Sequence, residues 1–261
     1  MRAFEQVLSA AENAFRGLMI DPAGLPTEPE TFELQLARSL EVWRAEGYRV
    51  AWLEVPMSHV GLIPVAVRLG FVFHHADPDH AMLTYSLTPR AFVPPHATHY
   101  IGAGGVVVNV RGELLVVVER VHRHQRPHYY KLPGGALKPG EHLVTGVRRE
   151  VLEETGIETR FVSLMGFRHW HGYRFGKSDI YFICRLEPLS EDVHCQMSEI
   201  LECGWMPVDA YLADENVGVF NKGVVAAALN GTGLVPGWFD GYATPETHEI
   251  FLPYGAQNND G

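Results

Sequence analysis

The stretch GGALKPGEHLVTGVRREVLEETGI, residues 134–157, decides the fold. After a glycine-rich loop it predicts a helix from about residue 142 to 154, because Leu143, Val147 and Val151 fall on one helical face. An apolar face of this kind is typical of a helix that packs on a hydrophobic core and not of a free charged rod.

The polar side of this predicted helix concentrates negative charge. Glu150, Glu153 and Glu154 are three and four positions apart, so their side chains project from one side, and Glu141 joins them from the preceding turn. Like charges at this spacing destabilise a helix by roughly a few tenths of a kcal/mol per pair unless a cation lies between them. Magnesium prefers such oxygen ligands, so the pattern predicts a bound divalent cation.

The same residues satisfy a longer spacing pattern, Gx5Ex7REUxEExGU, in which x is any residue and U is aliphatic. Its positions are filled by Gly135, Glu141, Arg149, Glu150, Val151, Glu153, Glu154, Gly156 and Ile157. A solvated acidic helix face is the alternative, but seven fixed positions match by chance only about once in 10⁸ windows. In this box the chain resembles the Nudix hydrolases.

This resemblance implies an α/β/α sandwich with a mixed sheet, and hydrolysis of a nucleoside diphosphate linked to another moiety. Glu150 and Glu154 would be the principal ligands of Mg²⁺ or Mn²⁺, and Glu153 a further ligand or a water-activating base. Glu141 would act through a water or a second metal ion, and Arg149 would orient the carboxylates.

The resemblance leaves the general base open, because in related structures it sometimes lies on a loop outside the box. Glu199, in SEILECGW (residues 198–205), is the candidate, and an ordinary surface glutamate is the alternative. The predicted catalytic residues are therefore Arg149, Glu153, Glu154 and Glu199.

A basic stretch, RVHRHQRPHYYK (residues 120–131), precedes the box in a chain whose net charge is −10. A polyanionic substrate would need these cations beside an acidic metal site, whereas a solvated hairpin loop is the alternative. A tyrosine here can stack on a nucleobase, and glycine lets a ligand approach the backbone. The predicted substrate-binding residues are Arg120, Arg126, Tyr130, Lys131, Gly134 and Gly135.

A closer likeness extends beyond the box. The segments ATHYIGAGGVVVN (97–109), FRHWH (167–171) and SDIYFICRLEP (178–188) resemble the Nudix branch that contains the antisense-fibroblast-growth-factor Nudix protein and plant ADP-ribose/NADH diphosphatases. The branch implies ADP-ribose or NADH as substrate, yielding AMP plus a second phosphate. The alternatives are a diadenosine polyphosphate, which the position of Tyr173 favours, another nucleotide including an RNA cap, and a non-catalytic nucleotide-binding module.

The amino-terminal third predicts a small α/β domain of its own. A helix over 31–47 and a strand over 48–55 precede a second helix over 58–70 and two strands within 70–87. This unit resembles the pre-Nudix domain of the same branch and the second half of an acetyltransferase fold. Only Gly61 stands where an acetyltransferase would need a glycine-rich loop, so we prefer a structural or dimerising module. A homodimer is the default expectation for this type of fold.

The domain boundary follows from proline, which interrupts helices and central strands. Three prolines, Pro89, Pro94 and Pro95, fall within the segment LTPRAFVPPHATH. We predict a pre-Nudix domain over 1–94, a Nudix domain over 95–235 and a carboxy-terminal tail over 236–261.

Composition limits the partners of this 261-residue chain. Its acidic balance argues against a protein built around nucleic-acid backbone binding, and no apolar run approaches the roughly 18 residues of a membrane-spanning helix. Cys184, Cys195 and Cys203 cannot all pair within the chain and match no zinc spacing, which predicts the reducing cytoplasm. We expect a cytoplasmic enzyme with a small nucleotide substrate and neither a membrane nor a nucleic-acid partner.

Overall fold

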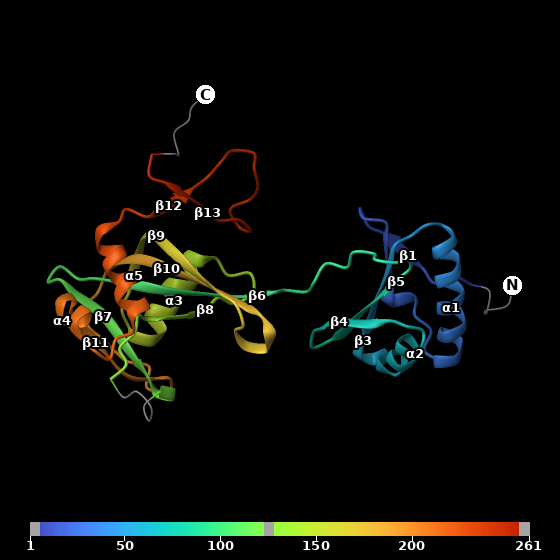
Figure 1. The fold of residues 1–261 in the computed structure, drawn as a ribbon, viewed down its shortest axis with the longest axis horizontal. Helices are drawn as coiled ribbons and strands as arrows, with labels where there is room; N and C mark the ends of the chain where they lie inside the picture. Colours follow the sequence, from blue (N-terminus) through green and yellow to red (C-terminus); the bar gives the residue numbers. More distant parts are fainter. Residues whose placement is uncertain (1–5, 123–127, 256–261) are drawn as a thin grey trace. The chain divides into compact units, whose positions relative to one another are not determined.

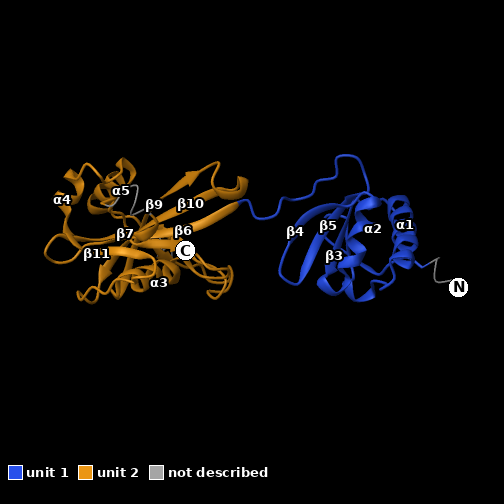
Figure 2. Cartoon of the chain, turned by 90° about the horizontal axis from the view of Figure 1, so that it is seen from below, with its two compact units in different colours: residues 1–98 blue, residues 99–261 orange. Residues whose placement is uncertain are grey.

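The computed structural model describes residues 6–122 and 128–255. The chain divides into two compact units, residues 1–98 and 99–261 (Figure 2). The first unit ends at residue 98, four residues after the boundary predicted at residue 94 and in the same proline-containing connection.

The first unit is a five-stranded mixed sheet with two helices on one side (Figure 1). The strands, in spatial order, are β1 (Ala10–Glu12), β2 (Gly17–Ile20), β3 (Val50–Pro56), β5 (His80–Ser86) and β4 (Val72–Ala76). The helices are α1 (Pro29–Ala45) and α2 (Ile63–Arg68), with 3₁₀ turns at η2 (Pro22–Gly24) and η3 (Met57–Leu62). Helix α1 buries Phe32, Leu36, Leu40 and Trp43, the residues whose spacing predicts it. The β1–β2 hairpin is not predicted by the sequence pattern.

The second unit contains a six-stranded mixed sheet and a separate two-stranded pair. The spatial order is β13 (Ile250–Pro253), β12 (Leu234–Gly237), β9 (Thr159–Trp170), β10 (Ser178–Pro188), β6 (His99–Val107) and β8 (Gly134–Ala136); β11 (Ile200–Pro207) pairs with β7 (Glu113–Glu119). The helices are α3 (Leu143–Thr155), α4 (Val208–Ala213) and α5 (Val219–Asn230), with 3₁₀ turns at η4 (Arg120–His122) and η5 (Arg174–Gly176). Strands β6 and β10 run parallel, which makes the larger sheet mixed.

Two hydrophobic cores lie on opposite faces of the strands. Val107 of β6 faces the α3 core, where it packs with Val147 and Val151, because alternate residues of a strand point to opposite faces. Its neighbour Val106 belongs to the other core, which includes Val225 of α5. The helices therefore sandwich the strands, which confirms the predicted α/β/α architecture.

The carboxy-terminal residues belong to the sheet. The sequence predicted a tail from residue 236, whereas β13 pairs with β12 and Glu249 reaches back to the start of α3. The Glu249 carboxylate accepts from the backbone N–H groups of Leu143 at 2.5 Å and Val144 at 3.2 Å. Free N–H groups at a helix start favour such an anion, and His142 at the N-cap makes no side-chain cap bond of its own.

Two of the three cysteines are paired. Cys195 and Cys203 form a disulfide across Cα atoms 5.7 Å apart, whereas Cys184 is a buried free thiol whose pKa is raised to about 12 by burial. A reducing compartment, which the sequence predicted, does not favour such a bond. Among the described residues no helix is long and apolar enough to cross a membrane.

Candidate active site

Arg149 binds three of the box carboxylates. It donates to both oxygens of Glu141 at 2.7 and 2.8 Å, to Glu150 at 2.7 Å and to Glu153 at 3.0 Å. These hydrogen bonds hold the pKa of Glu141 down at about 2, although burial opposes the shift, and they raise the pKa of Arg149. The chain itself thus places one positive charge among three carboxylates that would otherwise repel each other.

Glu154 has a different partner. Its Oε2 accepts from the backbone N–H of Gly134 at 2.8 Å, and only 6% of the residue is exposed. Burial raises the pKa of Glu154 to about 7, while the charge of Lys131 and the Gly134 hydrogen bond oppose that shift. A cation beside this carboxyl would restore its charged form, because opposite charge lowers a carboxyl pKa.

This pKa predicts how the stability of the metal-free protein depends on pH. The folded state keeps a proton on Glu154 up to about pH 7, whereas the unfolded chain releases it near pH ~4.3. The unfolded state binds fewer protons over this interval, so the free energy of unfolding should fall as pH rises from about 5 to 7, by up to roughly 3 kcal/mol. Urea denaturation in EDTA measures this fall. It should shrink in Glu154→Gln, and an unchanged slope in that variant would contradict the assignment.

The glycine loop before α3 brings backbone against the acidic side chains. Strand β8 pairs with β6 through Gly134 and Gly135. A Cβ atom added at Gly135 would come within 2.5 Å of the Glu150 carboxylate, which would have to shift, so this side chain lies close to the loop backbone. The loop backbone therefore lies beside Glu150 and Glu154, and the approach of a ligand to these glycines stays a prediction.

Glu199 and Glu154 line one cavity of about 610 Å³, here called the Glu154 cavity. Strands β7 and β11 pair antiparallel, with Glu119 opposite Ile200. Arg120 follows Glu119 and Glu199 precedes Ile200, so these two residues are neighbours at the same end of the pair. The Arg120 backbone N–H donates to the Glu199 carbonyl at 2.8 Å, and its guanidinium donates to the Ile200 carbonyl at 3.3 Å. The structure thus brings the candidate general base to the box.

A second cavity, the aromatic groove, has a volume of about 660 Å³ and adjoins the first at Glu119. Lys131, which pairs with Glu119, lines this groove together with Gly134 and Gly135. Its aromatic lining residues are Tyr100, Tyr129, Tyr173, Phe175, Tyr181 and Phe220. The groove therefore offers cations and aromatic rings beside the glycine loop.

Arg168 supplies a further charge to the aromatic groove. It donates to Asp179 at 2.6 Å, and its guanidinium carbon lies 5.4 Å from the centre of the Tyr181 ring and 5.1 Å from that of Phe220. Stacking of this kind fixes the plane of an arginine and leaves its polar edge available for a phosphate or carboxylate. Arg174 lines the same groove from the η5 turn.

One predicted substrate residue, Tyr130, stands apart from these cavities. Tyr130 packs partly buried against the α5 core, its hydroxyl donates to Glu202 at 3.3 Å, and it is absent from the described lining of both cavities. Arg126 lies outside the described residues. Arg120 lines the Glu154 cavity and not the aromatic groove.

Comparisons with known proteins match both units. A family model described as a NUDIX domain matches residues 98–227, and one described as a Nudix hydrolase domain matches residues 8–87. Nudix hydrolase 2 of Arabidopsis thaliana is 38% identical over 79% of this chain and 74% of its own length. The chain belongs to the Nudix hydrolase family.

Other Nudix relatives cover similar parts of the chain. Nudix hydrolase 8 of Arabidopsis thaliana is 37% identical over 79% of this chain and 56% of its own length. The human protein called nucleoside diphosphate-linked moiety X motif 6 is 35% identical over 77% of this chain and 64% of its own length. This chain thus spans little more than half the length of Nudix hydrolase 8. Both relatives agree with the branch to which the sequence motifs point.

Nudix hydrolases generally use divalent metal ions and act on small nucleotide substrates. The box carboxylates offer only oxygen donors, which fit a hard cation such as Mg²⁺ or Mn²⁺. Glu150 and Glu154 flank the glycine loop, one through its contact with Gly135 and the other through Gly134. These two residues fit such an ion, with Glu141 and Glu153 held near them by Arg149.

Sequence reasoning did not assign the cationic and aromatic residues of the groove. Arg168 and Asp179 occur in the segments FRHWH and SDIYFICRLEP, which resemble the Nudix branch but carry no recognisable spacing for a site. They meet because Trp170 and Asp179 are paired across β9 and β10. The two segments could be recognised by their resemblance to the branch, but only the pairing of β9 with β10 shows that Arg168 and Asp179 come together.

Proposed function

We propose that this chain is a metal-dependent Nudix diphosphatase, with ADP-ribose or NADH as the leading substrates and AMP plus a second phosphate as products. One observation carries the proposal: the buried Glu154 contacts the glycine loop and lines a cavity with Glu199, while Arg149 gathers Glu141, Glu150 and Glu153 beside it. A non-catalytic binding module would not need this complete set.

Each residue of the box has a proposed role. Glu150 and Glu154 would hold Mg²⁺ or Mn²⁺, Glu153 would add a ligand or activate water, and Glu141 would contribute through water. When bound, the ion neutralises diphosphate charge and lowers the pKa of a water ligand. Arg149 keeps the carboxylates in place by its hydrogen bonds.

The residues around the box bind the substrate and move the proton. Glu199 accepts a proton from the attacking water, since this residue lines the Glu154 cavity together with Glu154. Lys131 and Arg168, which line the aromatic groove, bind the phosphate oxygens that the reaction leaves negatively charged. The loop from Gly134 to Gly135 allows the diphosphate to reach the backbone.

Tyr173 is proposed to stack on the nucleobase. It lines the aromatic groove, and its ring centre lies 5.9 Å from that of Tyr100 and 5.1 Å from that of Trp170. Loss of base stacking costs about 1–3 kcal/mol, so Tyr173→Ala should raise KM about tenfold with little change in kcat. Steady-state kinetics measure this. Tyr254→Ala, an exposed tyrosine outside the groove, should leave KM unchanged.

A substrate panel tests the proposal. The untagged full chain, with Mg²⁺ or Mn²⁺, is given ADP-ribose, NADH, a diadenosine polyphosphate, a deoxynucleoside triphosphate and capped RNA, and products are identified by mass. The highest kcat/KM for ADP-ribose or NADH with release of AMP would support it. Reaction in H₂¹⁸O shows which phosphorus accepts the water oxygen. Absence of cleavage of every compound would overturn the diphosphatase proposal.

A second candidate, hydrolysis of diadenosine polyphosphates, is favoured by the place of Tyr173 in the aromatic groove. Six aromatic residues line that groove, which offers enough ring surface for more than one base. The same panel distinguishes the two, because a diadenosine polyphosphate with the highest kcat/KM would replace ADP-ribose and NADH in the proposal. The homodimer and the cytoplasmic location stay predictions, which light scattering and cell fractionation test.

A further inference from the structure

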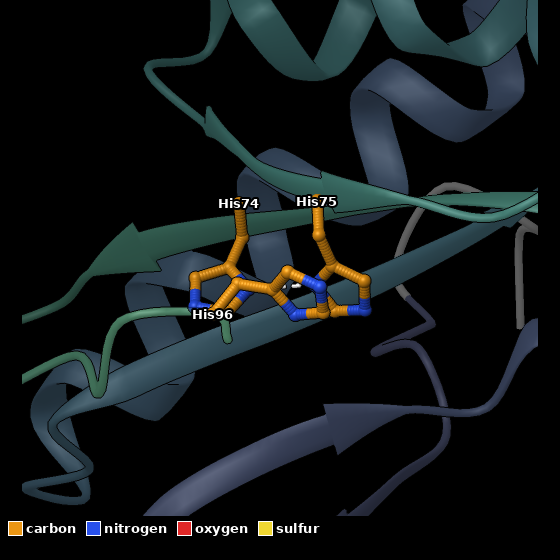
Figure 3. A group of neighbouring side chains, drawn as sticks. All are labelled: His74, His75 and His96. Carbon is orange, nitrogen blue, oxygen red and sulfur yellow. Dashed lines mark hydrogen bonds between the residues drawn. The ribbon is translucent and has the colours of Figure 1, made fainter. Parts of the chain in front are cut away.

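Strand β4 presents two neighbouring histidines on one face of the first unit. Residues of a regular strand alternate between faces, but the β4–β5 pairing skips His74, with Phe73 opposite Leu83 and His75 opposite Met82. This β-bulge turns His74 to the side of the sheet where His75 lies (Figure 3). Bulges of this type re-aim a side chain, and they are common next to functional sites.

A third histidine comes from the connection that follows the sheet. His96 stacks on His75, with ring centres 4.3 Å apart and an interplanar angle of 6°, and Figure 3 shows the rings of all three histidines together. One ring nitrogen from each of His74, His75 and His96 lies within 4.8 Å of the other two. The rings are partly exposed, so an ion can reach them from solvent.

The hydrogen bonds of His74 prepare one nitrogen as a ligand. Its Nε2 lies 2.7 Å from the carbonyl oxygen of Pro94, which can only accept, so this nitrogen carries the proton. His74 Nδ1 is then unprotonated and accepts a hydrogen bond from His75 Nδ1 at 2.7 Å, which a bound metal ion would replace. Histidine ligands commonly donate their other N–H to a backbone carbonyl in this way, which fixes the tautomer and the ring orientation.

We propose that His74, His75 and His96 bind one transition-metal ion, for which Zn²⁺ is the best fit. Three neutral imidazoles select zinc, copper or nickel over magnesium, and zinc accepts three protein ligands with water as the fourth. The ion would join the segment around Pro94 and His96 to strand β4, since these residues supply ligands from both. This site lies in the first unit and requires nothing from the diphosphatase residues.

An overlapping group, His75, Asp77 and His80, is the weaker arrangement. His80 is already engaged by two carboxylates, Asp79 at 2.8 Å and Asp77 at 3.6 Å. This group offers one imidazole fewer than the first group and has the exposed Asp77 carboxylate in its place. The two groups share His75, so variants of His96 and His80 separate them.

Titration of Zn²⁺ into the untagged full chain, in saturating Mg²⁺ to occupy the acidic site, tests the proposal by calorimetry. We expect one high-affinity Zn²⁺ per chain, with affinity reduced about 100-fold in His75→Ala and His96→Ala. His80→Ala and the matched control His59→Ala should bind as the unchanged protein does. Co²⁺ provides a spectroscopic probe, since a tetrahedral nitrogen site gives intense visible absorption that His96→Ala should lose.

Three outcomes would overturn the site. These are no saturable binding, full affinity in His96→Ala, or a loss in His80→Ala as large as in His96→Ala. Because His96 is exposed and outside every strand, its variant should fold normally, and circular dichroism checks this. In addition, Zn²⁺ should raise the melting temperature of the unchanged protein but not that of His96→Ala, since ligands that bind only the folded state stabilise it.

Discussion

Replacing Glu154 by glutamine is expected to lower kcat by about three orders of magnitude or more, equivalent to about 4 kcal/mol of transition-state stabilisation. Glutamine has the same shape and its amide oxygen can still accept the Gly134 N–H, but it cannot become an anion. The box would then lack a charged ligand at the place where the glycine loop meets the metal site. Steady-state kinetics with Mg²⁺ and the best substrate measure this loss.

The fold should survive this replacement. Glu154 is buried and its burial disfavours the charge, so removing that charge should leave the metal-free melting temperature unchanged or higher. Glu158→Gln, an exposed glutamate just after α3, is the matched control and should keep full activity. Full Mg²⁺-dependent activity in Glu154→Gln would remove this residue from the site.

Replacing Gly134 by alanine is expected to destabilise the second unit by about 3 kcal/mol or more. Gly134 has φ +150°, and a Cβ atom there would lie 2.2 Å from the Ala103 carbonyl oxygen and 2.6 Å from the Gly104 Cα. Both are backbone atoms of β6, which cannot withdraw without breaking the β6–β8 pairing. Urea denaturation followed by hydrogen exchange of the β6 amides reports on this unit alone.

Gly140→Ala provides the control for backbone conformation. Gly140 also has a positive φ, +74°, but a Cβ atom there would meet nothing within 4 Å. Its replacement should cost only about 1 kcal/mol, the price of the left-handed backbone. Equal losses in the two variants would show that the clash with β6 is not the cause.

The sequence predicts local features of the second unit closely. The helix expected near 142–154 is α3 (Leu143–Thr155), and Gly156 ends it with φ +73°. Its apolar and acidic faces follow from periodicity alone, because helical geometry places residues three and four apart on one side. Those features need no partner distant in sequence, which is why the pattern is sufficient.

Features that depend on how the chain folds back on itself were missed. Glu249 caps α3 from more than a hundred residues away, and β12 and β13 extend the sheet where the sequence predicted a tail. The Cys195–Cys203 pairing depends on how the chain turns between them. Arg168 joins the aromatic groove through the β9–β10 pairing. Strand pairing and capping join residues whose separation carries no period, so a single sequence has no signal for them.

By itself the sequence determined the family, the docked helix and the four glutamates that the box requires. Only the tertiary structure decided which partner each glutamate has. Glu154 accepts a hydrogen bond from the Gly134 N–H, whereas the other three pair with Arg149. Helical spacing puts carboxylates on one side, but their protonation depends on burial and on the donors that loops bring near. The proposed histidine site also depends on tertiary structure. A bulge in β4 turns His74 to the side of His75, and the connection after the sheet brings His96 to them.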